Sequence, residues 1–501
     1  MQKKISFILI FIFTVLFVQI AAVHAQKNPS DKLRTIAIPT DSIPPDSTDM
    51  RDLTSLELSK EMVPGWNLGN SLEAIGGETS WGNPKTTQRL IDSVKAAGFN
   101  AVRIPVAWSN NMNMTTFEID EDLLYRVEEV VNFALDNDMY AIINIHWDGG
   151  WMQPTYDQQE YVNNRLATIW RQIAIFFRDY TDYLLFAGTN EVMVDGDYGT
   201  PKKEYYTVQN SYNQTFVTTV RSTGGCNHFR HLVVQGFNTN IDYTASYFTI
   251  PKDVIENRLM VEVHYYDPYN FTINSNSSII QWGKDATDPS KTETWANESW
   301  ADGQFNKMKT KFIDKGYGVI LGEYGAMART KLGSDALNAE HAKYRLYYME
   351  YITGSIYKHG LVPFYWDSGF TGNNASGLFD RTSGEQAYPE IITAIMDATQ
   401  PATLVEPEKS KLQPKKQWLL QNYPNPFNPV THISFDIPSQ GYVSLKIFDI
   451  MGREVTTLVA AELPAGQYTR SWNASGVSSG EYFCRLQTGD ILETRKLILL
   501  R

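Results

Sequence analysis

The feature that most constrains the fold of this chain is a repeated alternation of short apolar runs with longer amphipathic segments. Eight runs have the composition of buried strands, and they cover residues 63–67, 100–108, 140–146, 183–191, 231–237, 259–266, 318–324 and 361–366. Helical periodicity follows most of them, as at residues 87–97, 120–136 and 335–359. This pattern predicts an α/β fold, a parallel (β/α)8 barrel. An open, doubly wound sheet is the alternative, because periodicity does not report closure.

The predicted barrel, residues 53–400, follows two segments of different character. Residues 3 and 4 are lysines that precede an apolar run at 5–20 and small residues at 21–25, which is typical of a secretory signal peptide over residues 1–25. A membrane anchor is the alternative, although the run is shorter than the roughly 20 apolar residues that a span needs. Residues 26–52 are rich in Pro, Asp, Ser and Thr, and they predict a flexible leader.

A second module is predicted after the barrel. Residues 401–418 are charged and contain proline, which indicates a linker. From residue 419 to 501, short alternating strands separated by Gly, Pro and Asn predict a small all-β sandwich. Its Gly-x-Ser-x-Gly at 476–480 lacks the strand and helix of a nucleophile elbow and is interpreted as a turn. The two cysteines, Cys226 and Cys484, fall in different modules, so no disulfide is expected.

Charge and composition narrow the class of ligand. The chain carries 44 Lys and Arg against 56 Asp and Glu, and 13% of its residues are aromatic. Nucleic-acid binding requires a basic surface, so no nucleic-acid partner is expected. A neutral polyhydroxylated ligand fits better. With eight His and no His-Glu-x-x-His, a metal hydrolase is the weaker alternative, and neither a metal nor another cofactor is predicted.

Polar residues close six of the predicted strands. The carboxyl ends of barrel strands form the active-site face, so these side chains are expected to share one pocket. Glu191 and Glu323 close strands four and seven, on roughly opposite sides of the ring, and are expected to face each other. Glycoside hydrolysis needs such a pair: one carboxylic acid protonates the leaving oxygen, and one carboxylate attacks the anomeric carbon or activates water.

Several ordered motifs resemble those of glycoside hydrolase family five, especially its subfamily four of endoglucanases and xyloglucanases. They are residues 65–70 (GWNLGN), 81–84 (WGNP), 100–105 (NAVRIP), 144–151 (NIHWDGGW), 190–191 (NE), 261–269 (VEVHYYDPY) and 322–325 (GEYG). The resemblance implies a retaining mechanism with Glu191 as acid/base and Glu323 as nucleophile, about 5 to 5.5 Å apart. It also implies that the cleavage subsite is lined by Arg103, His146, Asn190, His264, Tyr266 and Trp366.

Aromatic side chains indicate the substrate class, since sugar rings stack their apolar faces on them. The residues that fit this role are Trp147, Trp151 and Trp366. Residues 267–302 contain Trp282, Trp295 and Trp300 and form a candidate cleft wall, although core packing is the more common role for any single Trp. The chain is therefore predicted to be a monomeric, secreted endo-β-1,4-glucanase, a cellulase acting on β-glucan by double displacement. Xyloglucan-specific or mixed-linkage activity is the alternative within this class, and a non-catalytic glycan-binding surface protein is the alternative outside it.

The C-terminal module has its own resemblance. Residues 422–429 (NYPNPFNP), Thr431 and residues 495–501 (RKLILLR) resemble the C-terminal sorting domain of the type IX secretion system. This implies that the type IX secretion machinery recognises the module and leaves the enzyme secreted or attached to the cell surface. A carbohydrate-binding module is the alternative, because β-sandwiches host both functions, but Trp472 is the only Trp on the predicted sandwich strands. An adhesin that acts through this module is a third interpretation.

Overall fold

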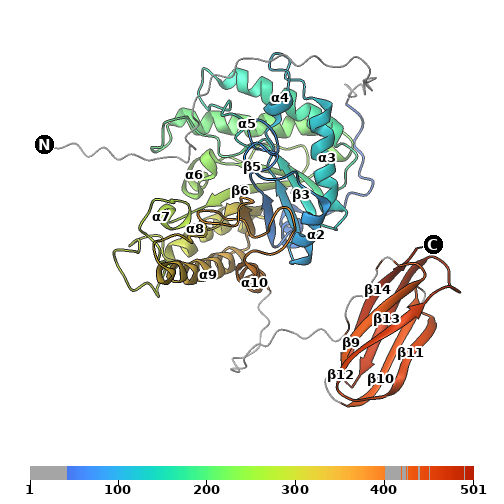
Figure 1. Ribbon diagram of the computed structural model, residues 1–501. Coiled ribbons are helices and arrows are strands. Elements are labelled where there is room, and N and C mark those ends of the chain that lie inside the picture. The colour runs from blue at the N-terminus through green and yellow to red at the C-terminus, as the bar shows by residue number, and fades with distance from the viewer. Residues whose placement is uncertain are drawn as a thin grey trace, which may run out of the picture. The chain divides into compact units, whose positions relative to one another are not determined.

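A computed structural model gives the architecture of the chain (Figure 1). It describes residues 42–400 and, in the C-terminal part, residues 419, 422, 425, 427–437, 440–450, 452–489 and 491–500. The predicted signal peptide, residues 26–41 of the predicted leader and the predicted linker lie outside the described residues. The chain divides into two compact units between Pro401 and Ala402.

Eight parallel strands close into a barrel, and β8 pairs with β1. The strands are β1 (Gly65–Leu68), β2 (Ala101–Ile104), β3 (Tyr140–Asn144), β4 (Leu184–Ala187), β5 (Leu232–Gln235), β6 (Leu259–Tyr265), β7 (Gly318–Tyr324) and β8 (Val362–Asp367). Closure confirms the predicted (β/α)8 barrel and excludes the open sheet. Several predicted runs extend past the strands at their carboxyl ends, because they include residues that follow the last ladder pair, such as 105–108 after β2 and 188–191 after β4.

Helices surround this barrel (Figure 1). They are α1 (Ser55–Glu61), α2 (Gln88–Ala96), α3 (Glu121–Leu135), α4 (Gln159–Phe176), α5 (Lys203–Ser222), α6 (Ile241–Tyr247), α7 (Tyr269–Thr272), α8 (Glu298–Lys311), α9 (Asp335–Lys358) and α10 (Pro389–Ala398), with short 3₁₀ turns η1 (Trp108–Asn111), η2 (Cys226–His228), η3 (Phe237–Thr239) and η4 (Ile313–Lys315). In α3 the buried residues Leu124, Val127 and Val131 recur at helical spacing and face the strands. None of the described helices is long and apolar enough to cross a membrane.

Residues 42–52 lie against the amino-terminal end of the barrel. The amide of Gly225, just before η2, donates to the carbonyl oxygen of Pro44 at 3.1 Å. Arg51 forms an ion pair with the buried carboxylate of Asp182 at 2.7 Å. The expectation of a flexible leader is therefore wrong for this part of the chain. Composition misses it because the contacts are made by backbone groups and a single arginine.

The second unit is an antiparallel sandwich. Its strands are β9 (Val430–Ile437), β10 (Gly441–Asp449), β11 (Glu454–Leu463), β12 (Gly466–Asn473), β13 (Gly480–Thr488) and β14 (Ile491–Leu499). One sheet has the order β11-β10-β13-β14, and β12 pairs with β9. Trp472 is buried against Phe427 and Tyr482, with ring centroids 5.3 Å apart in both pairs. This tryptophan belongs to the core, so it cannot serve as a sugar platform.

Candidate active site

The pairing of β6 with β7 positions the centre of the site. The register shifts after Val263, so that His264 pairs with Glu323 and Gly322 becomes the extra residue of a bulge. A Cβ on Gly322 would lie 2.0 Å from Oε1 of Glu262, so any side chain at this position would displace the Glu262 carboxylate. The bulge thereby brings three charged side chains from two strands to one place.

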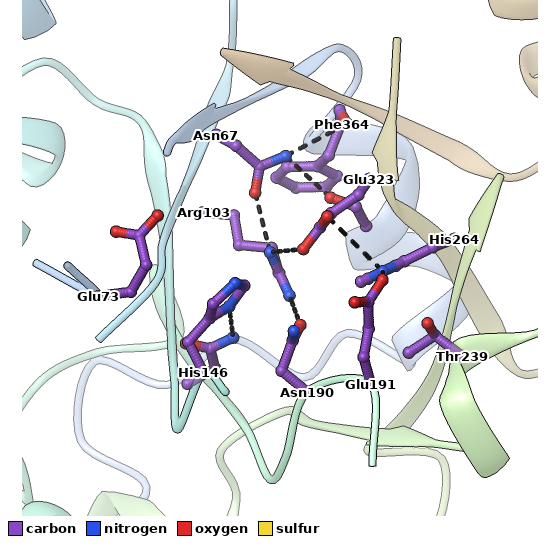
Figure 2. A network of polar contacts seen from close by, with 12 residues as sticks. Asn67, Glu73, Arg103, His146, Asn190, Glu191, Thr239, His264, Glu323 and Phe364 are labelled. Atoms are coloured by element: carbon purple, nitrogen blue, oxygen red, sulfur yellow. Dashed lines mark hydrogen bonds and ion pairs between the residues drawn. The ribbon is translucent and has the colours of Figure 1, made fainter. Parts of the chain in front are cut away.

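Glu323 is 5% exposed and is held by two donors. Its Oε1 accepts from Nη1 of Arg103 at 3.0 Å (Figure 2), and its Oε2 accepts from the Tyr266 hydroxyl at 3.2 Å. Burial raises the pKa of Glu323, and the charge of Glu191 adds to this, whereas the cations His264 and Arg103 oppose it. The two donors fix the carboxylate with both oxygens engaged, as a positioned nucleophile requires.

Glu191 lies after β4 in strained backbone. Its φ of 46° is in the left-handed region, which costs a non-glycine residue roughly 1 to 3 kcal/mol and is common at active sites. The side chain is 44% exposed, and Oε1 lies 2.7 Å from Nδ1 of His264. Oxygens of Glu191 and Glu323 lie within 4.8 Å of each other. An oxygen–oxygen distance within this limit is well below the roughly 6.5 to 9.5 Å between the carboxyl groups of inverting glycosidases and agrees better with the shorter spacing, roughly 5 to 5.5 Å, of retaining ones.

His264 lies between carboxylates on both sides. Its Nδ1 faces Glu191, and its Nε2 is 3.1 Å from Oε1 of Glu262, which is fully buried. Glu262 also forms an ion pair with Nε of Arg103 at 2.9 Å. Burial alone would lower the pKa of His264, but Glu323, Glu191 and Glu262 raise it to about 9. The ring is therefore an imidazolium near neutral pH.

Three further residues that were predicted for the cleavage subsite, Asn190, His146 and Trp366, belong to the same group of side chains. Oδ1 of Asn190 accepts from Nη2 of Arg103 at 2.5 Å, which leaves the Asn190 amide free to donate to a ligand. The ring of His146 stacks on Trp366 with centroids 5.7 Å apart and planes 12° apart. Burial and the charge of Arg103 lower the pKa of His146 well below its ordinary value, so this ring is neutral.

The tryptophans predicted from stacking divide into two groups. Trp147, after β3, is 53% exposed, and Trp295 and Trp300 are 44% and 38% exposed, so these three are open to a ligand. Trp282 is 2% exposed and donates from Nε1 to the carbonyl oxygen of Ala296. Trp282 therefore packs in the core, where the loop that carries it folds back onto α9, and it does not contribute to a cleft wall. Trp151 is half-buried and donates to Asp148.

Two residues of the cluster were not predicted from sequence. The Asn67 side chain on β1 accepts a hydrogen bond from Arg103 at 3.0 Å and donates one to the carbonyl oxygen of Gly322 at 2.8 Å. It thereby connects Arg103 to the bulge in β7. The carboxylate of Glu262 offsets part of the positive charge of Arg103 and His264, with both of which it forms ion pairs. Its signal is a carboxylate inside an apolar strand, two residues before His264 and therefore on the same strand face.

Glu191, His264 and Glu323 are also the group in the described residues whose spacing would suit a metal ion. Each ring nitrogen of His264 already faces a carboxyl group, Nδ1 that of Glu191 and Nε2 that of Glu262. The arrangement therefore suits proton transfer and nucleophilic attack better than metal coordination.

Comparison with known proteins gives a family match for each of the two units. Residues 67–372 match the family model for cellulase (glycosyl hydrolase family 5), and residues 421–500 match the secretion system C-terminal sorting domain. A xyloglucan-specific endo-beta-1,4-glucanase of Bacteroides ovatus is 44% identical over 74% of this chain and 75% of the relative. Endoglucanase A of Paenibacillus barcinonensis is 40% identical over 71% of this chain and 92% of the relative.

A solved structure agrees with these sequence relatives. The broad-specificity endoglucanase of Bacteroides salanitronis has a TM-score of 0.65 and 40% identity, over 70% of this chain and 96% of that one. With its barrel, paired carboxyls and sorting module, the chain belongs to glycosyl hydrolase family 5 and is a glycoside hydrolase of the endoglucanase type.

Proposed function

We propose that the enzyme is a retaining endo-β-1,4-glucanase in which Glu323 is the nucleophile and Glu191 the acid/base. The observation that carries this proposal is the pair of carboxyl groups, within 4.8 Å of each other but in unequal surroundings. Glu323 is buried and held by Arg103 and Tyr266. Glu191 is half-exposed, so its free oxygen can reach a leaving group.

In the first step, a Glu323 oxygen attacks the anomeric carbon while Glu191 gives its proton to the glycosidic oxygen. The bond from the anomeric carbon to that oxygen breaks, and a covalent glycosyl-enzyme forms. Because Oε1 of Glu191 faces His264, Oε2 is the oxygen that carries the transferred proton. In the second step, the Glu191 carboxylate takes a proton from water, whose oxygen attacks the same carbon and releases Glu323 with retained configuration.

The surrounding residues bind the sugar at the cleavage point. The Asn190 amide donates to the 2-hydroxyl, a bond that strengthens in the oxocarbenium-like transition state. The face of Trp366 provides an apolar surface for the sugar ring, with His146 stacked behind it. His264 contacts the carboxyl group of Glu191 and Tyr266 contacts that of Glu323, so these two residues fix the orientation of the pair.

Two glutamine variants test the roles. We expect Glu323→Gln to lose activity on every substrate by about four orders of magnitude. Glu191→Gln should lose about 100- to 10,000-fold on polysaccharide but form the glycosyl-enzyme normally from 2,4-dinitrophenyl β-cellobioside, whose leaving group needs no proton. Glu350→Gln, on the exposed side of α9, is the matched control. A Glu191→Gln enzyme that releases sugar from polysaccharide at the wild-type rate would contradict the assignment.

For the substrate we propose unbranched β-1,4-glucan, with xyloglucan as the second candidate. The second candidate is favoured by the 44% identical relative named as xyloglucan-specific. Reducing-sugar release on carboxymethyl cellulose, barley mixed-linkage glucan, tamarind xyloglucan, xylan and glucomannan ranks the candidates. A strong bias to xyloglucan would replace the first candidate by the second and leave both glutamates in place.

For localisation we propose export through the signal peptide, followed by recognition of the C-terminal module by the type IX machinery. The sorting-domain match supports secretion or cell-surface attachment. We also propose that the released enzyme is a monomer. Fractionation of cells that express the chain with and without residues 419–501 tests the first proposal, and light scattering of the purified enzyme tests the second.

A further inference from the structure

Glu262 is a fully buried carboxylate with no place in the mechanism above. It lies inside β6, two residues before His264, and its space is provided by the missing side chain of Gly322. Burying a carboxylate in an apolar strand is costly unless it is paired. A buried charge next to the residues that contact Glu191 and Glu323 indicates a functional role for Glu262.

The contacts of Glu262 connect it to both catalytic carboxyls through one intermediate residue each. Through Arg103, whose Nε is 2.9 Å away, it reaches Oε1 of Glu323. Through His264, whose Nε2 is 3.1 Å away, it reaches Oε1 of Glu191. Glu262 therefore contacts both Arg103 and His264, the two cations that in turn contact Glu323 and Glu191.

The geometry at His264 assigns its protons. An ionised carboxylate only accepts hydrogen bonds, and so does the carbonyl oxygen of a protonated carboxyl group, so a ring nitrogen that faces either must carry a proton. Glu262 occupies Nε2 and Glu191 occupies Nδ1. We propose that Glu262 is a positioning residue that keeps His264 doubly protonated and directs its Nδ1 proton to Glu191, thereby setting the charge at which the acid/base pair works.

Charge counting supports this role. The titratable and charged groups around Glu262 are Arg103 from β2, His146 after β3, Glu191 after β4, His264 and Tyr266 of the β6 segment, and Glu323 from β7. With His146 and Tyr266 neutral, two cations oppose the two carboxylates Glu262 and Glu323. The cluster is then neutral when Glu191 holds the proton that it must donate. Without Glu262 it carries one excess positive charge.

The pKa directions agree with this count. Burial would raise the pKa of Glu262, but the charge of Arg103 and the hydrogen bond of His264 lower it. Glu262 therefore remains ionised over the working range. Removing a negative charge lowers the pKa of every neighbouring group, so the loss of Glu262 is expected to move both limbs of the pH profile in one direction.

The experiment compares full-length wild type, Glu262→Gln and Glu262→Asp. In Glu262→Gln we expect both limbs of the kcat/KM profile to move to lower pH, with about a tenfold loss on the alkaline side. The His264 imidazole, followed by NMR and assigned with His264→Asn, should titrate near 9 in wild type and lower in Glu262→Gln. Glu262→Asp retains the charge and should restore the limbs even if kcat stays reduced.

Two results would overturn the proposal. One is a Glu262→Gln enzyme with unchanged limbs and an altered melting temperature only, which would indicate a structural role. The other is a wild-type His264 that titrates below about 6.5, the ordinary histidine value, which decides the question even where no variant folds. The interpretation of the limbs rests on the proposed roles of Glu191 and Glu323. The NMR titration does not depend on those roles, so failure of the two proposals can be distinguished.

Discussion

Two fully buried arginines lie at opposite ends of the barrel and have different partners. Arg103 lies on β2 near the carboxyl ends of the strands and faces the carboxylates Glu262 and Glu323. Arg230 lies just before β5, at the amino ends, and its guanidinium donates to Asn227 and to the backbone carbonyls of Phe177, Arg178, Tyr180, Thr181 and Leu184. Burial would lower the pKa of both, and it lowers that of Arg230 to about 9. For Arg103 the carboxylates outweigh burial and raise the pKa.

The difference shows that the partners, rather than burial itself, decide what a buried cation does. Backbone carbonyl oxygens do not change their protonation state, so Arg230 can only stabilise the turn between α4 and β4. Carboxylates can change their protonation state, so Arg103 influences the chemistry of Glu323. Arg103 is therefore expected to matter for rate, and Arg230 for stability.

The largest effect is expected at Arg103. Arg103→Met removes one of the two cations that face Glu262 and Glu323 and leaves only His264, so kcat/KM should fall by about a thousandfold or more. Arg103→Lys, which keeps the charge but loses the two-pronged donor, should recover only part of the rate. Steady-state kinetics on a soluble β-glucan measure both. A melting temperature that falls while kcat/KM is kept would place Arg103 in the same class as Arg230.

Arg230→Met tests the other end of the barrel. Its loss leaves several buried carbonyl oxygens without donors, and we expect the free energy of unfolding to fall by about 3 kcal/mol. The kcat of the folded enzyme should not change. Urea unfolding followed by tryptophan fluorescence gives the first quantity, and activity below the transition gives the second. A loss of activity in Arg230→Met without a loss of stability would contradict the assignment of Arg230 to stability and Arg103 to rate.

A smaller effect is expected at Arg51, which binds the segment 42–52 at the same end as Arg230. Arg51→Ala leaves the buried carboxylate of Asp182 unpaired, but Arg51 is itself 37% exposed. The expected loss of unfolding free energy is about 1 to 2 kcal/mol. Lys309→Ala, which breaks the exposed pair with Asp314, is the control and should cost less than about 0.5 kcal/mol. Equal losses in the two variants would show that residues 42–52 add no stability.

The most modest effect concerns pH at the Arg103 end. Burial raises the pKa of Glu323 above the ordinary glutamic acid value, with Glu191 adding to it and His264 and Arg103 opposing it. In the proposed mechanism Glu323 is the nucleophile and must be ionised, so activity should be lost as pH falls through this raised pKa. The acidic limb of kcat/KM should therefore lie above the ordinary glutamic acid pKa. A limb at or below that value would mean that the two cations outweigh burial.

Much of this site was predictable because its signals are local. Glu191 and Glu323 close apolar runs, and strand ends in a (β/α)8 barrel converge on one face whatever the helices do. The resemblance then assigned roles to residues such as Arg103 and Tyr266, which the structure brings together around the two glutamates. The sequence left the role of Trp282 open between core packing and a cleft wall, because its exposure depends on how its loop folds back, and spacing carries no information on that.

By itself, the sequence determined the eight-unit barrel, the sandwich and the two paired carboxyls, since period and strand ends depend on neighbours along the chain. Only the tertiary structure decided that Glu262 lies behind Arg103 and His264, and that Gly322 makes room for it. It also decided that residues 42–52 lie against the barrel. The physical reason is that a buried charge or an ordered segment depends on partners many residues away, and their position follows from closure of the barrel and the bulge in β7.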